Sequence, residues 1–205
     1  VEGNDLPDFN PDDEYLQEIK SPIFYAVQKN INIQTGQPTI LDFDMQRISQ
    51  RINIVFNIRT EGNIKREDLA APIIELSGAC GRFNIADACL DTTRLYRMAH
   101  QVQPDEFTQT GEGTYRCVVH FHTLGVIPSA AKGHLNGPGI LQVALQVSTP
   151  QLDSSGAPVV DEEGNPVKNS RYIYGAINPY DELTAAQLIE AVSYTHLTLP
   201  TNSRV

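Results

Sequence analysis

The stretch Arg51-Ile-Asn-Ile-Val-Phe-Asn-Ile58 decides the fold class of this chain. Side chains of a β-strand point alternately to its two faces, so every second residue shares a face. β-Branched and aromatic side chains also favour the strand conformation. The stretch therefore predicts a strand with one apolar face in a core and one polar face toward solvent. The apolar face consists of Ile52, Ile54, Phe56 and Ile58.

Two later stretches repeat this alternation, and they predict two further long strands. The apolar positions are Tyr115, Cys117, Val119 and Phe121 in residues 114–122, and Leu141, Val143, Leu145 and Val147 in residues 139–147. Shorter strands are predicted at residues 73–76 and 171–174. A half-buried strand is predicted at residues 41–46, where Leu41, Phe43 and Met45 alternate with polar residues. Strands at short intervals with scarcely any helix are typical of an all-β sandwich.

Smaller features lie between these strands. Residues 77–81 read Ser-Gly-Ala-Cys-Gly; they lack the Lys-Ser/Thr ending of a phosphate loop and favour a strand bulge or tight turn. Residues 66–69 suit a single helical turn, and residues 156–167 suit a small hairpin. One short helix is predicted near the C-terminus, at residues 184–191, where Thr184 begins a capping box.

The composition suits a loop-rich globular protein, with 40% hydrophobic residues, 14 Gly and 13 Pro. The net charge of −10 argues against a nucleic-acid partner, because phosphate binding requires a basic face. No apolar run approaches the roughly 20 residues of a membrane-spanning helix. Residues 1–20 are acidic and rich in turn residues but lack the spacing of an EF-hand, so they are interpreted as a solvated linker.

The character of the sequence changes at the tail, residues 192–205. Residues 192–201 back-translate into a transposase-based sequencing adapter, so we interpret the tail as an adapter-derived artefact and exclude it from the fold. The alternative is an ordinary terminal strand, because residues 194–199 alternate in polarity.

His120 and His122 are candidate metal ligands, because residues i and i+2 of a strand share a face. Two imidazoles so placed would bind a metal if His100 or His134 and a carboxylate lay near them. No further ligand stands at diagnostic spacing. A solvent-facing histidine pair is the favoured interpretation, and we expect no metal or other cofactor.

The three cysteines leave two interpretations open. Cys80 and Cys89 would form a disulfide in an oxidising compartment, leaving Cys117 alone. Free buried thiols are the preferred alternative.

The sequence gives no sign of an enzyme. It holds no Gly-x-Ser-x-Gly elbow, and Cys117 falls on the apolar face of its strand, where thiols are usually inert. The paired carboxylates lie in turns without the apolar surroundings that raise a carboxyl pKa. Exposed tyrosines offer a different function, the binding of a glycan, and the candidates are Tyr172, Tyr174 and Tyr180.

Three segments resemble the C-terminal domain of the fimbrillin superfamily, the subunits and accessory proteins of type V pili. They are Ile40-Leu-Asp-Phe-Asp-Met-Gln-Arg-Ile-Ser-Gln-Arg-Ile-Asn-Ile-Val-Phe56, Ile74-Glu-Leu-Ser-Gly-Ala-Cys-Gly81 and Tyr172-Ile-Tyr-Gly-Ala-Ile-Asn-Pro-Tyr-Asp181. The similarity spans residues 22–190 and carries no catalytic signature. It departs from the family at Arg51, where an apolar residue is commoner, so a fimbrillin-like lipoprotein fits as well as a pilin.

The resemblance implies a transthyretin-like, Greek-key β-sandwich. Residues 1–27 would end a preceding domain and form its acidic linker, and residues 28–191 would be a truncated C-terminal domain. It also implies a fimbrial protein of the cell surface and outer membrane that is attached through an upstream N-terminal lipid anchor. Its partners would be other fimbrial subunits, joined by strand addition, and host or bacterial surface ligands in adhesion. The alternative is a glycan-binding surface lipoprotein.

Overall fold

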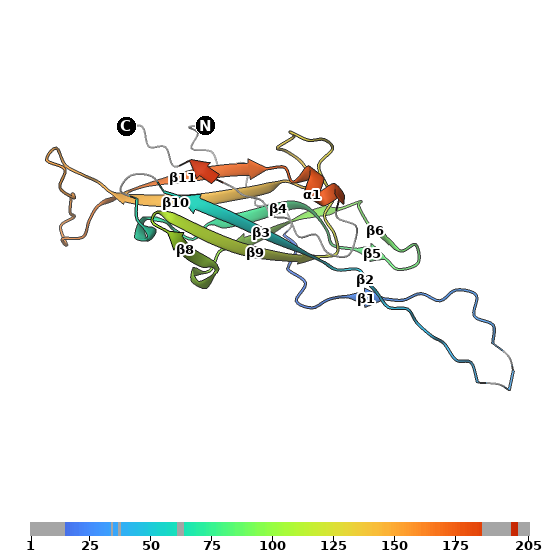
Figure 1. Ribbon diagram of the computed structural model, residues 1–205. Helices are drawn as coiled ribbons and strands as arrows, with labels where there is room; N and C mark the ends of the chain where they lie inside the picture. Colours follow the sequence, from blue (N-terminus) through green and yellow to red (C-terminus); the bar gives the residue numbers. More distant parts are fainter. Residues whose placement is uncertain (1–14, 34, 37, 61–63, 186–197, 201–205) are drawn as a thin grey trace.

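The computed structural model describes residues 15–33, 35–36, 38–60, 64–185 and 198–200. Its body consists of two four-stranded sheets packed face to face (Figure 1). The first sheet has the order β11 (Lys168–Ile177), β10 (Leu141–Pro150), β4 (Ile73–Cys80) and β7 (Leu95–Gln101). The second has the order β12 (Thr198–Pro200), β3 (Gln50–Arg59), β9 (Thr114–Thr123) and β8 (Phe107–Gly111). Neighbouring strands are antiparallel, except that β12 runs parallel to β3. The all-β fold class is confirmed. β12 lies in the tail, so the exclusion of residues 198–200 from the fold is wrong.

β3 and β9 are the best-paired strands of the second sheet. Their ladder runs without interruption from Gln50 opposite Thr123 to Arg59 opposite Thr114. The alternating pattern places the predicted apolar residues of both strands on the inner face, where all of them are buried. The strands predicted at residues 51–58 and 114–122 are therefore confirmed.

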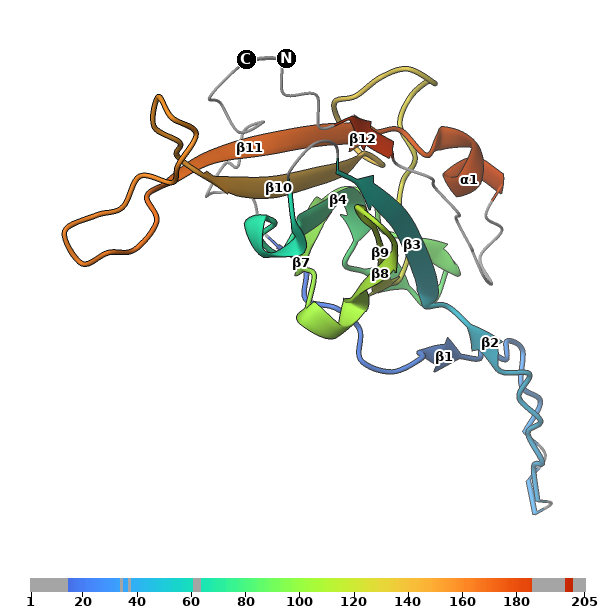
Figure 2. The same cartoon turned by 60° about the vertical axis from the view of Figure 1, so that its left-hand side comes forward.

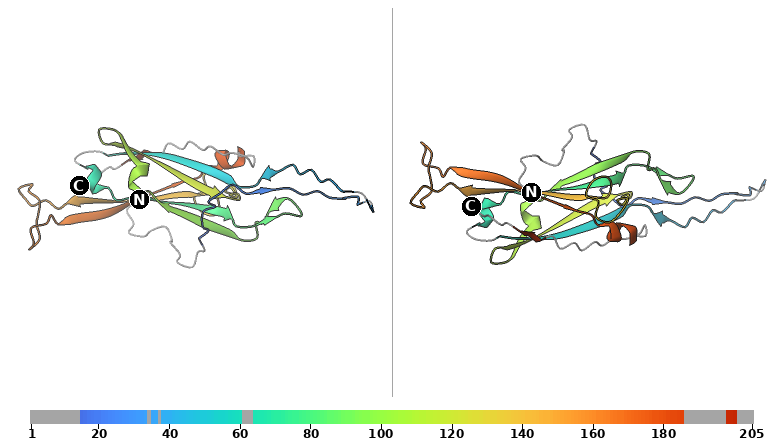
Figure 3. Two further views of the ribbon diagram at one scale, coloured as in Figure 1. Left: turned by 90° about the horizontal axis from the view of Figure 1, so that it is seen from below. Right: turned by 90° about the horizontal axis from the view of Figure 1, so that it is seen from above.

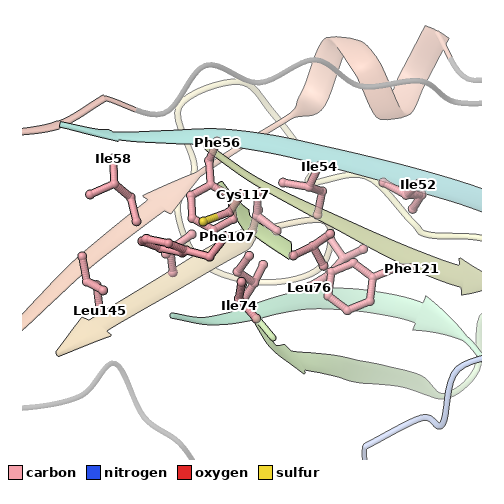
Figure 4. Packing of buried hydrophobic residues seen from close by; sticks show 14 of the residues in the cluster. Ile52, Ile54, Phe56, Ile58, Ile74, Leu76, Phe107, Cys117, Phe121 and Leu145 are labelled. Atoms are coloured by element: carbon pink, nitrogen blue, oxygen red, sulfur yellow. The ribbon is translucent and has the colours of Figure 1, made fainter. Parts of the chain in front are cut away.

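The core lies between the two sheets (Figure 4). β10 contributes its predicted apolar face, and Leu145 points toward Phe56 and Ile58 of the opposite sheet. Phe56, Ile58 and Leu145 are at most 1% exposed. Burial of each such side chain stabilises the fold by about 1.5–3 kcal/mol, so these alternating strands account for the two-layer arrangement.

The predicted bulge lies in β4. The pairing of β4 with β7 shifts between Ser77 and Ala79, and Gly78 takes a φ of +83°. A residue other than glycine is strained at such a φ, so the glycine at this position permits the bulge. The Ser77 hydroxyl donates to the carbonyl oxygen of Gly137, at 2.7 Å, and so ties the bulge to the loop before β10.

Helices are short. The described residues include two 3₁₀ turns, η1 (Arg66–Asp68), as predicted, and η2 (Pro104–Glu106). The helix near the C-terminus is α1 (Tyr180–Ala185), and residues 186–191 of the predicted helix lie outside the described residues. The capping box predicted at Thr184 is wrong, because Thr184 lies inside α1 and its hydroxyl donates to the Tyr180 carbonyl oxygen. No helix among the described residues is long and apolar enough to cross a membrane.

Two long connections project from opposite ends of the sandwich (Figure 3). Residues 151–167, between β10 and β11, form the predicted hairpin, with isolated bridges between Leu152 and Pro158 and between Val160 and Pro166. At the other end, residues 26–45 extend beyond a two-residue ladder of β1 (Phe24–Tyr25) with β2 (Gln46–Arg47). We call residues 26–45 the arm. A smaller hairpin, β5 (Phe83–Asn84) with β6 (Cys89–Leu90), lies near the base of the arm.

The half-buried strand predicted at residues 41–46 is wrong. Only Gln46 and the next residue are in a strand, and Leu41, Phe43 and Met45 are exposed by 39%, 52% and 57%. The alternation is present in the sequence, but no described part of this chain covers the apolar side.

Residues 15–25 run along the open side of the sandwich. Tyr15 forms a parallel bridge with Arg97 of β7, and the Leu16 N–H donates to the Arg97 carbonyl oxygen at 2.8 Å. Further on, the Ile19 N–H donates to the carbonyl oxygen of His122, on the other sheet, at 3.1 Å. This segment therefore links the two sheets at the β7 side.

Candidate functional site

The arm is the most unusual surface of the described chain. Large apolar side chains are exposed along both of its sides, and Ile33 and Ile40 are 76% and 83% exposed. On the returning side the apolar residues 41, 43 and 45 alternate with Asp42 and Asp44, so an extended backbone gives this side one apolar and one acidic face. Contiguous apolar surface of this kind marks interaction sites.

The base of the arm is fixed to the sandwich. The Tyr25 ring meets Phe83 edge to face at 5.0 Å between centroids, and the Tyr25 hydroxyl donates to Gln46 Oε1 at 3.3 Å. Lys29 Nζ donates to the Ala86 carbonyl oxygen at 3.2 Å. A cleft of 660 Å³ lies between the arm and the β5–β6 hairpin. The arm therefore leaves the body in a defined direction, away from the sheets (Figure 2).

The sandwich also presents two strand edges on the side of β11 and β3. β11 ends the first sheet, and among the described residues only β10 pairs with it. In the second sheet, the described partner on the outer side of β3 is β12, which pairs with residues 57–59. Within the described part of the chain, residues 50–56 of β3 thus have an outer edge without a strand partner. Every second backbone N–H and C=O group of such an edge points outward and can pair with an added strand.

The surroundings of the β3 edge are amphipathic. The inner face of β3 is apolar and buried, whereas Arg51 on the outer face is exposed. Across the interior, Ile173 and Ile177 of β11 are only partly buried against the core. A strand added to β3 would meet apolar side chains on one face and a cation on the other.

His120 and His122 lie on the outer face of β9, both partly buried. His120 Nδ1 lies 2.6 Å from Asn53 Oδ1, and His122 Nδ1 lies 3.1 Å from the Ile19 carbonyl oxygen. Burial lowers the pKa of His120, and the positive charges of Arg51 and His122 lower it further. Both contacts are made by Nδ1, so they fix the orientation of each ring on the outer face of β9.

The other suggested ligands do not complete a metal site. His100 Nε2 lies 2.7 Å from Glu106 Oε2. His134 lies in an exposed loop, where its carbonyl oxygen accepts a hydrogen bond from the Asn178 side chain. Burial acts to raise the pKa of Glu106, but hydrogen bonds from the Gln103 N–H and from His100 outweigh it and lower the pKa. Among the described residues, no group of histidine, cysteine or acidic side chains has the arrangement of a metal site.

The three cysteines are free thiols, so Cys80 and Cys89 are not joined in the structure. Cys80 is buried at the end of β4, whereas Cys89 is exposed in the β5–β6 hairpin. Cys117 is buried in the core, and this burial raises its thiol pKa to about 12. A buried, protonated thiol is a poor nucleophile.

The candidate tyrosines are divided between two places. Tyr172 and Tyr174 lie on the outer face of β11 with nearly parallel rings, 14° apart in plane and 6.0 Å between centroids. Tyr172 is 56% exposed. Tyr180 is partly buried at the start of α1 and is not part of this pair.

Comparison of the chain with protein-family models, curated proteins and solved structures finds no match in any of the three. The sequence patterns pointed to the strands but missed the exposed arm. No local pattern distinguishes the arm, because residues 41–45 alternate like a half-buried strand.

Proposed function

We propose that this chain is a non-enzymatic surface protein, a fimbrial subunit or fimbria-associated protein, that assembles by β-strand pairing and mediates adhesion. The observation that carries the proposal is the outer edge of β3, which no described strand pairs along residues 50–56. An added strand satisfies the backbone groups of such an edge, and this is a general mode of protein association. The resemblance of three segments to fimbrillins points in the same direction.

The finer features follow from the same resemblance. The sandwich would have the transthyretin-like, Greek-key topology of that superfamily. The protein would be displayed at the outer membrane through an N-terminal lipid anchor. Its partners would be other fimbrial subunits, and its ligands would lie on host or bacterial surfaces.

Hydrogen exchange in a concentration series tests the proposal. We expect the protein to self-associate as its concentration rises, and we expect the amides of residues 50–56 to become more slowly exchanging in the associated form. Amides of residues 141–144, where β10 is paired with both β11 and β4, serve as the internal control. A protein that remains monomeric at high concentration, with unchanged exchange along β3, would contradict strand assembly.

A glycan-binding surface lipoprotein is the second candidate, supported by Tyr172 and Tyr174. Their parallel, partly exposed rings resemble the stacking surfaces on which sugar rings bind, and Gln146 of β10 lies opposite Tyr172. Calorimetric titration with purified oligosaccharides tests this. Saturable binding that is lost in Tyr172→Ala and kept in Tyr96→Phe would favour it.

A further inference from the structure

The returning side of the arm has the composition of a strand that inserts beside another strand. Its apolar residues Leu41, Phe43 and Met45 are exposed in this chain, and Asp42 and Asp44 share the opposite face. Exposed apolar area of this size is costly in water and is normally covered by a partner. Apart from the β1–β2 ladder at its base, none of the described backbone groups of residues 38–45 is paired in a strand.

The arm cannot reach the β3 edge of its own molecule. Gln46 pairs with Tyr25, and the Ile48 N–H donates to the Ile23 carbonyl oxygen at 2.9 Å. The chain therefore runs straight from the arm into β3, and the arm points away from the sheets (Figure 1). Within the described part of the chain, no strand of the same molecule covers residues 41–45.

The β3 edge matches the arm in length, polarity and charge. Residues 50–56 have an outer edge that no described strand pairs, and this edge is about as long as residues 40–45. A strand laid there would turn its apolar face toward the partly buried Ile173 and Ile177 and its acidic face toward the exposed Arg51. The chain has a net charge of −10, so an exposed cation such as Arg51 distinguishes this edge as a partner for the acidic face of the arm.

We propose that residues 40–45 of one molecule pair with the edge of β3, residues 50–56, in a second copy of this chain. This inference rests on the proposed function, because it names the strand that the β3 edge receives. The contact joins different surfaces of the two molecules, so it allows either a head-to-tail series or a reciprocal exchange of arms.

Charge reversal tests the pairing. We expect Asp42→Lys with Asp44→Lys to raise the apparent dissociation constant of self-association about tenfold or more, and Arg51→Glu to do the same. An equimolar mixture of the two variants should associate, because the reversed arm then meets the reversed edge. Glu162→Lys with Glu163→Lys is the matched control: it makes the same charge change on the exposed hairpin at the other end and should associate like the original protein.

The outcomes separate this inference from the proposed function. The variant Asp42→Lys with Asp44→Lys could still associate like the original protein, with slowed hydrogen exchange in β3. That result would overturn the arm as the donor strand and would leave strand assembly intact. Failure of the mixed variants to associate, with both variants folded by circular dichroism, would also overturn the inference. Absence of any self-association would overturn both.

Discussion

Gly78 lies so close to Gly139 that a side chain at position 78 would collide with the Gly139 backbone. A Cβ on Gly78 would stand 2.6 Å from the Gly139 nitrogen, and a Cβ on Gly139 would stand 2.7 Å from the Ile127 carbonyl oxygen. The Gly139 N–H donates to the Ser77 carbonyl oxygen at 3.0 Å, and the Ile127 N–H donates to that of Gly78 at 2.9 Å. The bulge of β4 is thus packed backbone to backbone against the loops that follow β9 and precede β10.

This contact predicts a large cost for Gly78→Ala. The new side chain would have both an unfavourable positive φ and a clash with the backbone, so we expect the free energy of unfolding to fall by at least about 2 kcal/mol. Gly133→Ala is the control, because Gly133 has a similar φ of +85° with nothing within 4 Å of its Cβ position. It should cost about 1 kcal/mol, from the backbone alone. Urea unfolding followed by circular dichroism measures both, and equal costs would contradict the close packing.

Two phenylalanines provide a second comparison. Phe56 is 1% exposed in the core, whereas Phe43 is 52% exposed on the arm. We expect Phe56→Ala to lower the free energy of unfolding by about 3–5 kcal/mol and Phe43→Ala to change it by no more than about 0.5 kcal/mol. The measurement is made at a concentration where the protein is monomeric. A large loss for Phe43→Ala in the monomer would show that the arm is part of the core and would remove it as a free strand.

The long strands could be predicted from the sequence because apolar and polar residues alternate along them. In β3, β9 and β10 the predicted apolar residues lie on the inner face and are buried, so one local pattern suffices to find these strands. The bulge at Gly78 was predictable from the sequence too, because a glycine inside a strand often marks a bulge or a close approach of backbones.

The arm shows where this reasoning fails. Residues 41–45 alternate as well as β3 does, but alternation reports only that one side is suited to burial. Whether a neighbour covers that side depends on contacts distant in sequence, and none of the described residues supplies them. The contacts of His120 and His122 were unpredictable in the same way, since Asn53 and Ile19 are far from them along the chain.

Thiol labelling tests the states of the cysteines. In the folded protein at pH 8, we expect iodoacetamide to modify Cys89, which is exposed, and to leave Cys117 intact, because burial raises its pKa to about 12. Cys80 should also be protected, since burial raises its pKa too. Peptide mass spectrometry identifies the modified residue, and urea should expose all three thiols. Recovery of a disulfide-linked Cys80–Cys89 peptide would contradict free thiols.

The stability of the protein should depend on pH through His120. Its pKa in the folded state is lowered by burial and by the positive charges of Arg51 and His122, although Glu106 and Glu18 act in the opposite direction. The folded state therefore binds fewer protons than the unfolded state between that lowered pKa and the ordinary value of 6.5. The contribution of His120 to the free energy of unfolding is therefore complete above its ordinary pKa. It is lost as the pH falls through the lowered pKa of the folded state.

Replacement of His120 should remove this part of the pH dependence. We expect the free energy of unfolding of His120→Gln to fall less than that of the original protein between pH 7.5 and pH 5, as measured by urea unfolding at each pH. His134→Gln, in an exposed loop, should keep the original dependence. A His120→Gln variant whose stability falls as steeply as that of the original protein would show that His120 is not held in its neutral form on the outer face of β9. The His120 imidazole would then be protonated at mildly acidic pH and would add positive charge beside Arg51.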